Sequence, residues 1–252
     1  MKTKFIQDDN IKYFREFVWC LEKINVYHVK FKTGNHTTKF KRENYPIVFQ
    51  TEQLVYKDRL TQFLNDTVNT KIILDYSVIN KSILSKHNKT VILCPIFYMK
   101  EFLFPPQLKE YDFVMTGYFT PRRKKIYDGL VERGFKVLNI TNEYDMANKY
   151  KLILSAKCLL NIHAYDGESM FEFARCSVPV YNNMNVISEK SLIDNEQNNL
   201  TNDYVLEHII FCDYEDVIET AIKNLERKIN VDYSYLEKIS RYEIQRINRE
   251  LK

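Results

Sequence analysis

Two charged residues three positions apart, Glu172 and Arg175, are the most chemically suggestive pair in this 252-residue chain. They follow an apolar, strand-like segment at 158–162 and a polar turn at Asp166-Gly167. Residues three apart on a helix share a face, so the two side chains can contact one ligand or form a salt bridge with each other. A helix that starts after such a turn presents free N–H groups to an anion. The stretch therefore predicts anion binding, with a solvated salt bridge as the alternative.

The elements around this turn determine where its polar residues point. Ser169 is the expected N-cap of a helix that begins near Met170. We expect this helix to close around 179–181, at the proline that precedes an Asn-Asn turn. The next strand is then 186–188, and Glu189 lies at its carboxyl end, on the rim of a cleft.

A second turn carries further cations. Gly117 ends a strand, Pro121 stands at a first helical position, and Arg122 and Arg123 follow it. Cations there oppose the helix dipole, which makes more sense with a phosphate or carboxylate nearby; a solvated helix face is the alternative. The turn has a single glycine, so an NAD-type glycine fingerprint is absent. His163, at the end of the strand 158–162, is either a structural residue or a functional one, as a catalytic group or a ligand of the donor.

Polar residues also occur at predicted strand ends in the first half of the chain. Glu52 follows a strand at 45–50, where ligands of open α/β sheets bind, and is a substrate ligand, a general base or a helix cap. Asp75 follows a strand at 71–74 and is either a helix N-cap or a residue of the site. His28 lies in an alternating, strand-like segment.

The elements that position these residues alternate between strand and helix patterns, which predicts an α/β fold with parallel sheets. The Pro105-Pro106 pair interrupts the alternation, and we place the domain boundary there. The expected domains are 1–108, 109–232 and a C-terminal helix, 233–252, which packs back on the first domain or serves as a partner surface. Several finer elements are also predicted: a helix after Asp8-Asp9, a loop over 190–205 and a helix over 214–227.

Composition narrows the class of protein. A net charge of +4 does not favour nucleic acid as a partner. Five dispersed cysteines without a CxxC motif indicate reduced core thiols. The sequence contains no apolar run long enough to span a membrane, and its first residues lack the apolar core of a signal peptide. We expect a soluble protein of the cytoplasm, or of the host cytoplasm if it is viral; its oligomeric state stays open.

The second half resembles the nucleotide-sugar-binding domain of GT-B-fold glycosyltransferases, and more narrowly a glycosyltransferase-like group of bacteria and large DNA viruses. The resemblance covers roughly residues 45 to 215. It rests on four segments in the family's order: IVFQTEQL (47–54), ILDYSVIN (73–80), VMTGYFTPRRKKIYDGL (114–130) and LLNIHAYDGESMFEFARCSVPVYNNMNVISE (159–189). The last is the most specific, because it combines NIH on a strand, ExxR on a helix and a strand that ends in SE.

The resemblance implies two Rossmann-like domains that face each other across a cleft, with a reduced N-terminal, acceptor-side domain. Glu172 would contact the nucleotide ribose. Gly117, the Arg122–Arg123 pair and the helix start near Ser169 would hold the diphosphate of a UDP- or GDP-linked sugar. Arg175 and Glu189 match recurrent family positions without an assigned role.

An enzyme of this kind would transfer the sugar to an unknown acceptor without a metal or other cofactor, because helix N–H groups and arginines can stabilise the leaving diphosphate. An inverting reaction also needs a base, for which His28, Glu52 and Asp75 are the candidates. The short first domain and the missing glycine-rich loop leave an alternative: a catalytically inactive scaffold that acts through protein contacts.

Overall fold

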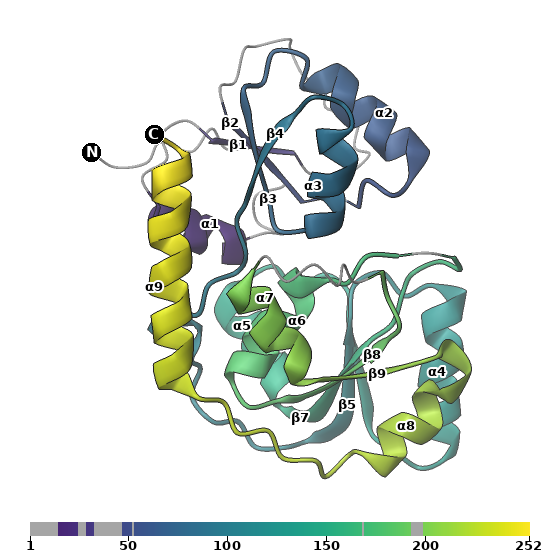
Figure 1. Ribbon diagram of the computed structural model, residues 1–252. Helices are drawn as coiled ribbons and strands as arrows, with labels where there is room; N and C mark the ends of the chain where they lie inside the picture. Colours follow the sequence, from purple (N-terminus) through teal and green to yellow (C-terminus); the bar gives the residue numbers. More distant parts are fainter. Residues whose placement is uncertain (1–14, 25–28, 33–46, 52, 168, 193–198) are drawn as a thin grey trace. The chain divides into compact units, whose positions relative to one another are not determined.

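The computed structural model describes residues 15–24, 29–32, 47–51, 53–167, 169–192 and 199–252, which form two parallel β-sheets with their helices (Figure 1). The chain divides into two compact units. The first contains residues 1–97, 193–201 and 238–252, and the second contains 98–192 and 202–237. The predicted α/β class, with strands and helices in alternation and parallel sheets, is confirmed, and it is of a Rossmann-like kind.

The sheet of the first unit has four parallel strands in sequence order. They are β1 (Val29–Lys32), β2 (Ile47–Gln50), β3 (Ile72–Asp75) and β4 (Thr90–Leu93). Strands β2 to β4 are short and mostly apolar, as expected for a sheet that is covered on both faces.

Alternating strand residues divide the core of the first unit into two layers. Val48, on one face of the sheet, belongs to a cluster with Phe63 of α2 (Lys57–Asp66) and Leu84 of α3 (Val78–Ser85). The adjacent Phe49 points to the other face, where its ring lies 4.7 Å from that of Phe17 in α1 (Arg15–Glu22). Helices therefore cover both faces of this sheet.

The second unit contains a five-stranded parallel sheet in the order β6-β5-β7-β8-β9. Its strands are β5 (Tyr111–Thr116), β6 (Val137–Ile140), β7 (Ala156–Asn161), β8 (Asn185–Glu189) and β9 (Ile209–Cys212). The chain leaves β5 toward β6 and then returns past β5 to β7. The loops after β5 and β7 consequently run in opposite directions, which is the switch point where open α/β sheets bind ligands.

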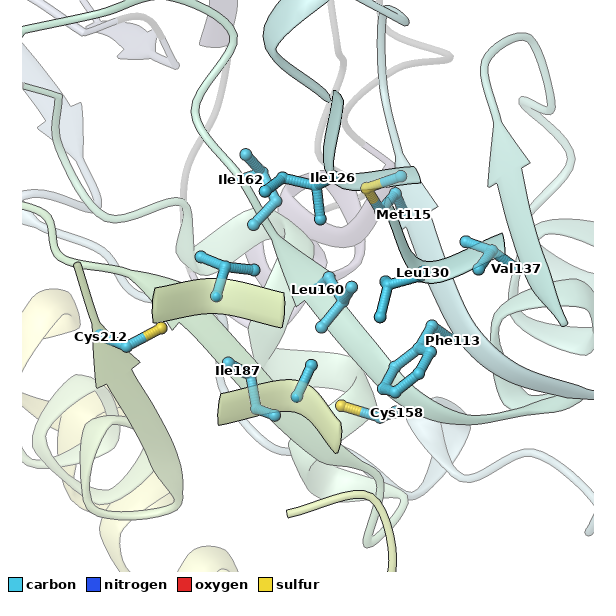
Figure 2. Close-up of a cluster of buried hydrophobic side chains, with 12 residues drawn as sticks. Phe113, Met115, Ile126, Leu130, Val137, Cys158, Leu160, Ile162, Ile187 and Cys212 are labelled. Carbon is cyan, nitrogen blue, oxygen red and sulfur yellow. The ribbon is translucent and has the colours of Figure 1, made fainter. Parts of the chain in front are cut away.

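Helices also cover both faces of this second sheet. Ile126 and Leu130 of α4 (Pro121–Glu132) and Ala221 of α8 (Val217–Lys223) pack on Leu160 and its neighbours in one core cluster (Figure 2). Helices α5 (Met146–Leu154) and α6 (Phe173–Tyr181) contact β7 and lie on the opposite side from α4 and α8 (Figure 1).

Two helices are shared between the units. Helix α7 (Leu200–Glu207) changes unit after Thr201. Helix α9 (Tyr233–Glu250) begins in the second unit and continues from Lys238 in the first, where Nη2 of Arg246 donates to the carbonyl oxygen of Leu93 at 2.6 Å. The division thus returns two segments to the first unit. Residues 238–252 agree with the expectation that the C-terminal helix packs back on the first domain, whereas the return of 193–201 was not predicted.

The structure corrects several predicted element boundaries. The helix expected near Met170 begins at Phe173, because Met170 instead forms a parallel bridge with Leu192. The predicted loop over 190–205 contains the start of α7, and the helix expected over 214–227 is a 3₁₀ turn followed by α8, which ends at Lys223. Helix α2 was not predicted, although its Leu60, Phe63 and Leu64 have helical spacing. The start of the helix predicted after Asp8-Asp9 lies outside the described residues.

All five cysteines are free and buried, which confirms the predicted core thiols. Among the described residues, no helix combines the length and the apolar character that crossing a membrane requires.

Candidate functional site

The candidate site lies at the carboxyl edge of the second sheet, around the switch point between β5 and β7. Gly117 follows β5 directly and has a φ of 95°, in the left-handed region that favours glycine. His163 comes two residues after β7, and Glu189 is the last residue of β8. Because parallel strands end at the same edge, these turns bring their side chains together.

Arg123 is the central cation of the site. Thr120 caps α4 by accepting the backbone N–H of Arg123, so the arginine lies in the first turn of that helix. Its guanidinium is buried and donates to two carbonyl oxygens, from Nε to Ile162 at 2.9 Å and from Nη1 to Tyr118 at 2.8 Å. Arg123 therefore links the loops after β5 and β7.

Arg175 approaches the same place from α6. Its Nη1 donates to Oδ1 of Asn161 at 2.6 Å, and its Nη2 forms an ion pair with Glu172. A Cβ added to Gly117 would lie 2.9 Å from Nη1 of Arg123 and 3.2 Å from Nη2 of Arg175. The absence of a side chain at Gly117 thus allows two guanidinium groups to lie against the backbone after β5.

The electrostatics of Arg123 are unusual for an arginine. Burial, followed by the positive charge of Arg175, lowers the pKa of Arg123 to about 10, although Glu172 partly opposes this effect. Within the described part of the chain Arg123 forms no ion pair, because both of its hydrogen-bond acceptors are neutral carbonyl groups. An anion bound beside Gly117 would supply the charge that this pair of cations lacks.

Arg122, the neighbouring arginine, is already paired. Its Nη1 and Nη2 donate to the two carboxylate oxygens of Glu189, each at 2.5 Å, and its Nε donates to Asp166 at 2.7 Å. The guanidinium carbon lies 3.6 Å from the ring centroid of Tyr214. Burial opposes the charge of Arg122, but the hydrogen bonds that Arg122 donates to Glu189 and Asp166 outweigh this effect and raise the pKa of Arg122.

Glu189 also orients His163. The backbone N–H of His163 donates to Oε2 of Glu189 at 3.0 Å, and the imidazole Nδ1 lies 3.6 Å from Oε1. On the other side of the ring, Nε2 lies 2.9 Å from Oγ of Ser191. Burial is the main cause that lowers the pKa of His163, so the imidazole is neutral at pH 7.

The structure places most of the sequence-predicted donor-site residues at this one edge. They are Gly117, Arg122, Arg123, His163, Glu172, Arg175 and Glu189. Glu172 does not lie within a helix but is the N-cap residue of α6, and its side chain remains 26% exposed. Ser169 is not the N-cap: it is buried ahead of the bridge residue Met170, and its carbonyl oxygen accepts the N–H of Leu192.

The predicted base candidates are located elsewhere. Asp75 is fully buried in the first unit, where its two oxygens accept the backbone N–H of Ser77 at 2.8 Å and Nδ2 of Asn80 at 2.9 Å. Burial raises the pKa of Asp75 well above its usual range, and these hydrogen bonds offset only part of the rise. These contacts give Asp75 a structural role, but the N-cap of α3 is Ser77, not Asp75 as the sequence had suggested. His28 and Glu52 lie outside the described residues.

Sequence reasoning missed several residues of the site. Asn161 and Ser188 are polar residues in otherwise apolar strands, and they join the two strand ends through a 3.0 Å hydrogen bond. Tyr118 directly follows Gly117, Tyr165 lies two residues after His163, and the two tyrosines are 76% and 60% exposed. Polar residues at the ends of buried strands, and aromatic residues directly after them, were the available signals. Among the described residues, no group of three or more His, Cys, Asp or Glu is placed to hold a metal ion.

No model of a known protein family matches the chain. The chain is similar to proteins of Acanthamoeba polyphaga mimivirus. It is 32% identical to Uncharacterized protein L138 over 196 residues, which cover 74% of this chain but 21% of that protein. It is 27% identical to Uncharacterized protein L137 over 222 residues, covering 82% and 29%, and 26% identical to Uncharacterized protein R358 over 238 residues, covering 90% and 81%. The chain thus spans less than a third of the length of L138 and L137. These names assign no activity.

Proposed function

We propose that the chain is a glycosyltransferase that moves a sugar from a nucleotide-sugar donor to an acceptor, with the donor diphosphate bound beside Gly117. The observation that carries the proposal is the convergence of Arg123 and Arg175 on this glycine at the β5–β7 switch point. Arginine offers a planar set of donors that suits phosphate oxygens, and the glycine allows those oxygens to approach the backbone.

Charge supplies the chemistry of the proposed reaction. When the bond between the sugar and the diphosphate breaks, negative charge grows on the leaving diphosphate. Arg123 is held in place by Ile162 and Tyr118, and Arg175 by Asn161, before any ligand arrives. Donors that are fixed in advance stabilise developing charge without reorganisation, and this type of interaction is the largest contribution to many enzymic rates.

The proposal divides the roles of the arginines. Arg122 already donates hydrogen bonds to Glu189 and Asp166 and lies over the ring of Tyr214. Its role is therefore to hold the loops of the site in place, and it is not a ligand of the diphosphate. Arg123 and Arg175 are the diphosphate ligands. Glu172, next to Arg175 and partly exposed, can accept hydrogen bonds from the hydroxyl groups of a ribose. The nucleotide would be uridine or guanosine diphosphate, as the resemblance implies.

The proposal includes the GT-B arrangement, in which a second Rossmann-like domain binds the acceptor. The parallel α/β sheet of the first unit supports this part, since it provides a second sheet of the required class. No metal is required by the proposed chemistry, because the two guanidinium groups provide the positive charge.

Ligand binding to the full chain tests the proposal. We expect UDP or GDP, or one of their sugar conjugates, to raise the melting temperature, because a ligand that binds only the folded state stabilises it. Arg123→Gln and Arg175→Gln should each weaken binding by about 1.5–3 kcal/mol, as expected for a hydrogen bond to a charged group. Arg133→Gln is the matched control, since Arg133 is exposed at the end of α4 and pairs with Glu219.

The opposite results would count against the proposal. A chain that binds no nucleotide or nucleotide sugar is not a nucleotide-sugar transferase. Equal losses for Arg175→Gln and Arg133→Gln would show that general surface charge, and not the cation pair, holds the ligand.

A non-catalytic scaffold is the second candidate function. Asp75 favours it, because both oxygens of this predicted base are already engaged within the first unit. The scaffold predicts a stable complex with a protein partner and no consumption of any donor. Donor turnover by the purified chain would eliminate it.

A further inference from the structure

The carboxyl edge of the second sheet also holds a hydroxyl, an imidazole and a carboxylate in series. Oγ of Ser191 lies 2.9 Å from Nε2 of His163, and the opposite ring nitrogen, Nδ1, lies 3.6 Å from Oε1 of Glu189. His163 is buried, whereas Ser191 is only partly buried, so the series runs from the interior toward solvent. This series is separate from the contacts that Arg123 and Arg175 make.

We propose that Ser191 and His163 form a proton relay, in which His163 removes the proton of an acceptor hydroxyl through the hydroxyl of Ser191. The inference rests on the proposed glycosyl transfer and adds to it a base and an acceptor class: an alcohol, including a sugar hydroxyl, or water. It also supplies a base within the second unit, whereas the base candidates named from the sequence, His28, Glu52 and Asp75, all precede that unit.

Glu189 sets the direction of the relay. Its carboxylate faces Nδ1 of His163, which favours the tautomer with the proton on that nitrogen. At 3.6 Å the contact is too long for a hydrogen bond, so the carboxylate acts through its charge. The lone pair of Nε2 then faces the hydroxyl of Ser191. The hydrogen bond from the His163 backbone N–H to Glu189 fixes the start of the loop that carries the ring.

The charge environment keeps the imidazole available as a base. Burial lowers the pKa of His163, and the charges of Arg122 and Arg175 act in the same direction. Glu189 and Glu172 oppose them without reversing the shift. A neutral imidazole at pH 7 has the free electron pair that a general base requires.

The step balances in atoms and charge. The acceptor oxygen forms a bond to the anomeric carbon, and the bond from that carbon to the diphosphate oxygen breaks, with its electron pair leaving on the diphosphate. The acceptor proton passes to Oγ of Ser191 while the serine proton passes to Nε2 of His163. The imidazolium keeps its new proton and donates a hydrogen bond to Oγ. The serine hydroxyl can then donate to the carbonyl oxygen of Glu189, which lies 3.1 Å from Oγ. Solvent finally removes the proton from the imidazolium.

The test compares donor binding and donor turnover in the full chain. The donor is whichever UDP- or GDP-linked sugar binds the wild type, and turnover is the release of nucleoside diphosphate with alcohols or water as acceptor. We expect Ser191→Ala and His163→Gln to lower turnover by about 10²–10⁴-fold while donor affinity is retained. Ser191→Thr keeps a hydroxyl and should restore part of the turnover. Ser82→Ala and His87→Gln, both at exposed positions in or after α3, are the matched controls.

A pH profile separates the relay from a structural role. Wild-type kcat should fall as the pH decreases through the pKa of His163, and this acid limb should be absent in His163→Gln. Ser191→Ala provides the same comparison if the substitution of buried His163 prevents folding.

A donor that binds wild type without being consumed would overturn the relay and the proposed transfer together. Two results would overturn the relay alone: variants that turn over like wild type, and a sugar found covalently on Ser191 by mass spectrometry of the intact chain. The last would make the serine a nucleophile. If no nucleotide sugar binds the wild type, the proposed function itself fails and the relay fails with it.

Discussion

Arg123 and Arg175 reach the same face of Gly117 from two different helices, α4 and α6. Their nearest nitrogens would lie 2.9 Å and 3.2 Å from a Cβ at this position. The arrangement has a cost in the free protein, because the positive charge of Arg175 contributes to the lowered pKa of Arg123. A site that keeps two cations this close before a ligand arrives is suited to an anion with more than one charge.

Gly117→Ala should therefore destabilise the protein and disable the site. A left-handed alanine costs roughly 1–2 kcal/mol in backbone conformation alone. The added methyl group would also displace the Arg123 guanidinium, so the total loss in the free energy of unfolding should be larger. Chemical denaturation measures this loss, and calorimetry with UDP or GDP measures the expected loss of affinity.

Gly134→Ala is the matched control for this substitution. Gly134 has a φ of 85°, but a Cβ there would meet no atom within 4 Å. It should show the backbone cost alone, with nucleotide affinity unchanged. Equal destabilisation by the two substitutions would mean that the contacts of Gly117 with the guanidinium groups contribute nothing.

The Arg122–Glu189 pair should contribute strongly to stability. Their side chains are 14% and 10% exposed, and the contact is bidentate. Glu189→Ala leaves Arg122 in a largely desolvated place and removes the acceptor of the His163 N–H. We expect a loss of about 3 kcal/mol in the free energy of unfolding, the lower end of the range for breaking a buried pair, because some solvent access remains.

A double-mutant cycle with Arg122→Ala gives the coupling between the two residues, and the double variant should lose less than the sum of the single variants. The Lys124–Asp128 pair on the same helix is the control. Its side chains are 59% and 44% exposed, so Asp128→Ala should change stability by less than about 1 kcal/mol. Similar losses at the two positions would contradict the importance assigned to Glu189.

Much of this site was predictable because it lies where apolar strands end. A buried strand followed by a polar residue is visible in sequence, which is how His163 and Glu189 were found. The pattern could not tell which of the two adjacent arginines would face the proposed ligand. Arg122 and Arg123 make different contacts, and their partners are distant in sequence: Glu189 ends β8, and Ile162 directly follows β7.

The missed helix boundaries have a similar cause. The helix start near Met170 was predicted from local capping residues, but the backbone there is used in a bridge to Leu192, a tertiary contact that local sequence does not encode. The start of helix α7 was predicted to be loop because this helix is short and its first half is polar. Its buried hydrophobic residues, Tyr204 and Val205, lie in the second half. Packing, more than local preference, stabilises such a helix.

His163 should make stability depend on pH in the weakly acidic range. Its pKa is lowered in the folded state, so below about pH 6.5, the ordinary histidine value, the unfolded chain binds a proton that the folded chain resists. The free energy of unfolding should therefore fall as the pH decreases from about 6.5, until the folded imidazole also becomes protonated. Denaturation at several pH values measures this slope.

The slope should be smaller in His163→Gln and unchanged in His87→Gln, since His87 lies at an exposed position after α3. The carboxylates titrate at lower pH, so a comparison of the two variants between about pH 6.5 and 5 isolates the histidine. A slope that persists in His163→Gln would show that another group is responsible.

Tyr118 and Tyr165 should bind the ring of the nucleotide base. Both rings are largely exposed on the loops that flank the switch point, and the carbonyl oxygen of Tyr118 accepts from Arg123. Stacking of a base on an aromatic ring contributes about 1–3 kcal/mol, so Tyr118→Ala and Tyr165→Ala should weaken UDP or GDP binding by that amount. Tyr118→Phe and Tyr165→Phe keep the ring and should bind like wild type.

Inorganic pyrophosphate has no base to stack, so its affinity should be unchanged in all four variants. Tyr242→Ala, an exposed position in α9, controls for the loss of a surface tyrosine. If the alanine variants at 118 and 165 lost pyrophosphate and nucleotide affinity equally, the tyrosines would support the arginines and would not contact the base.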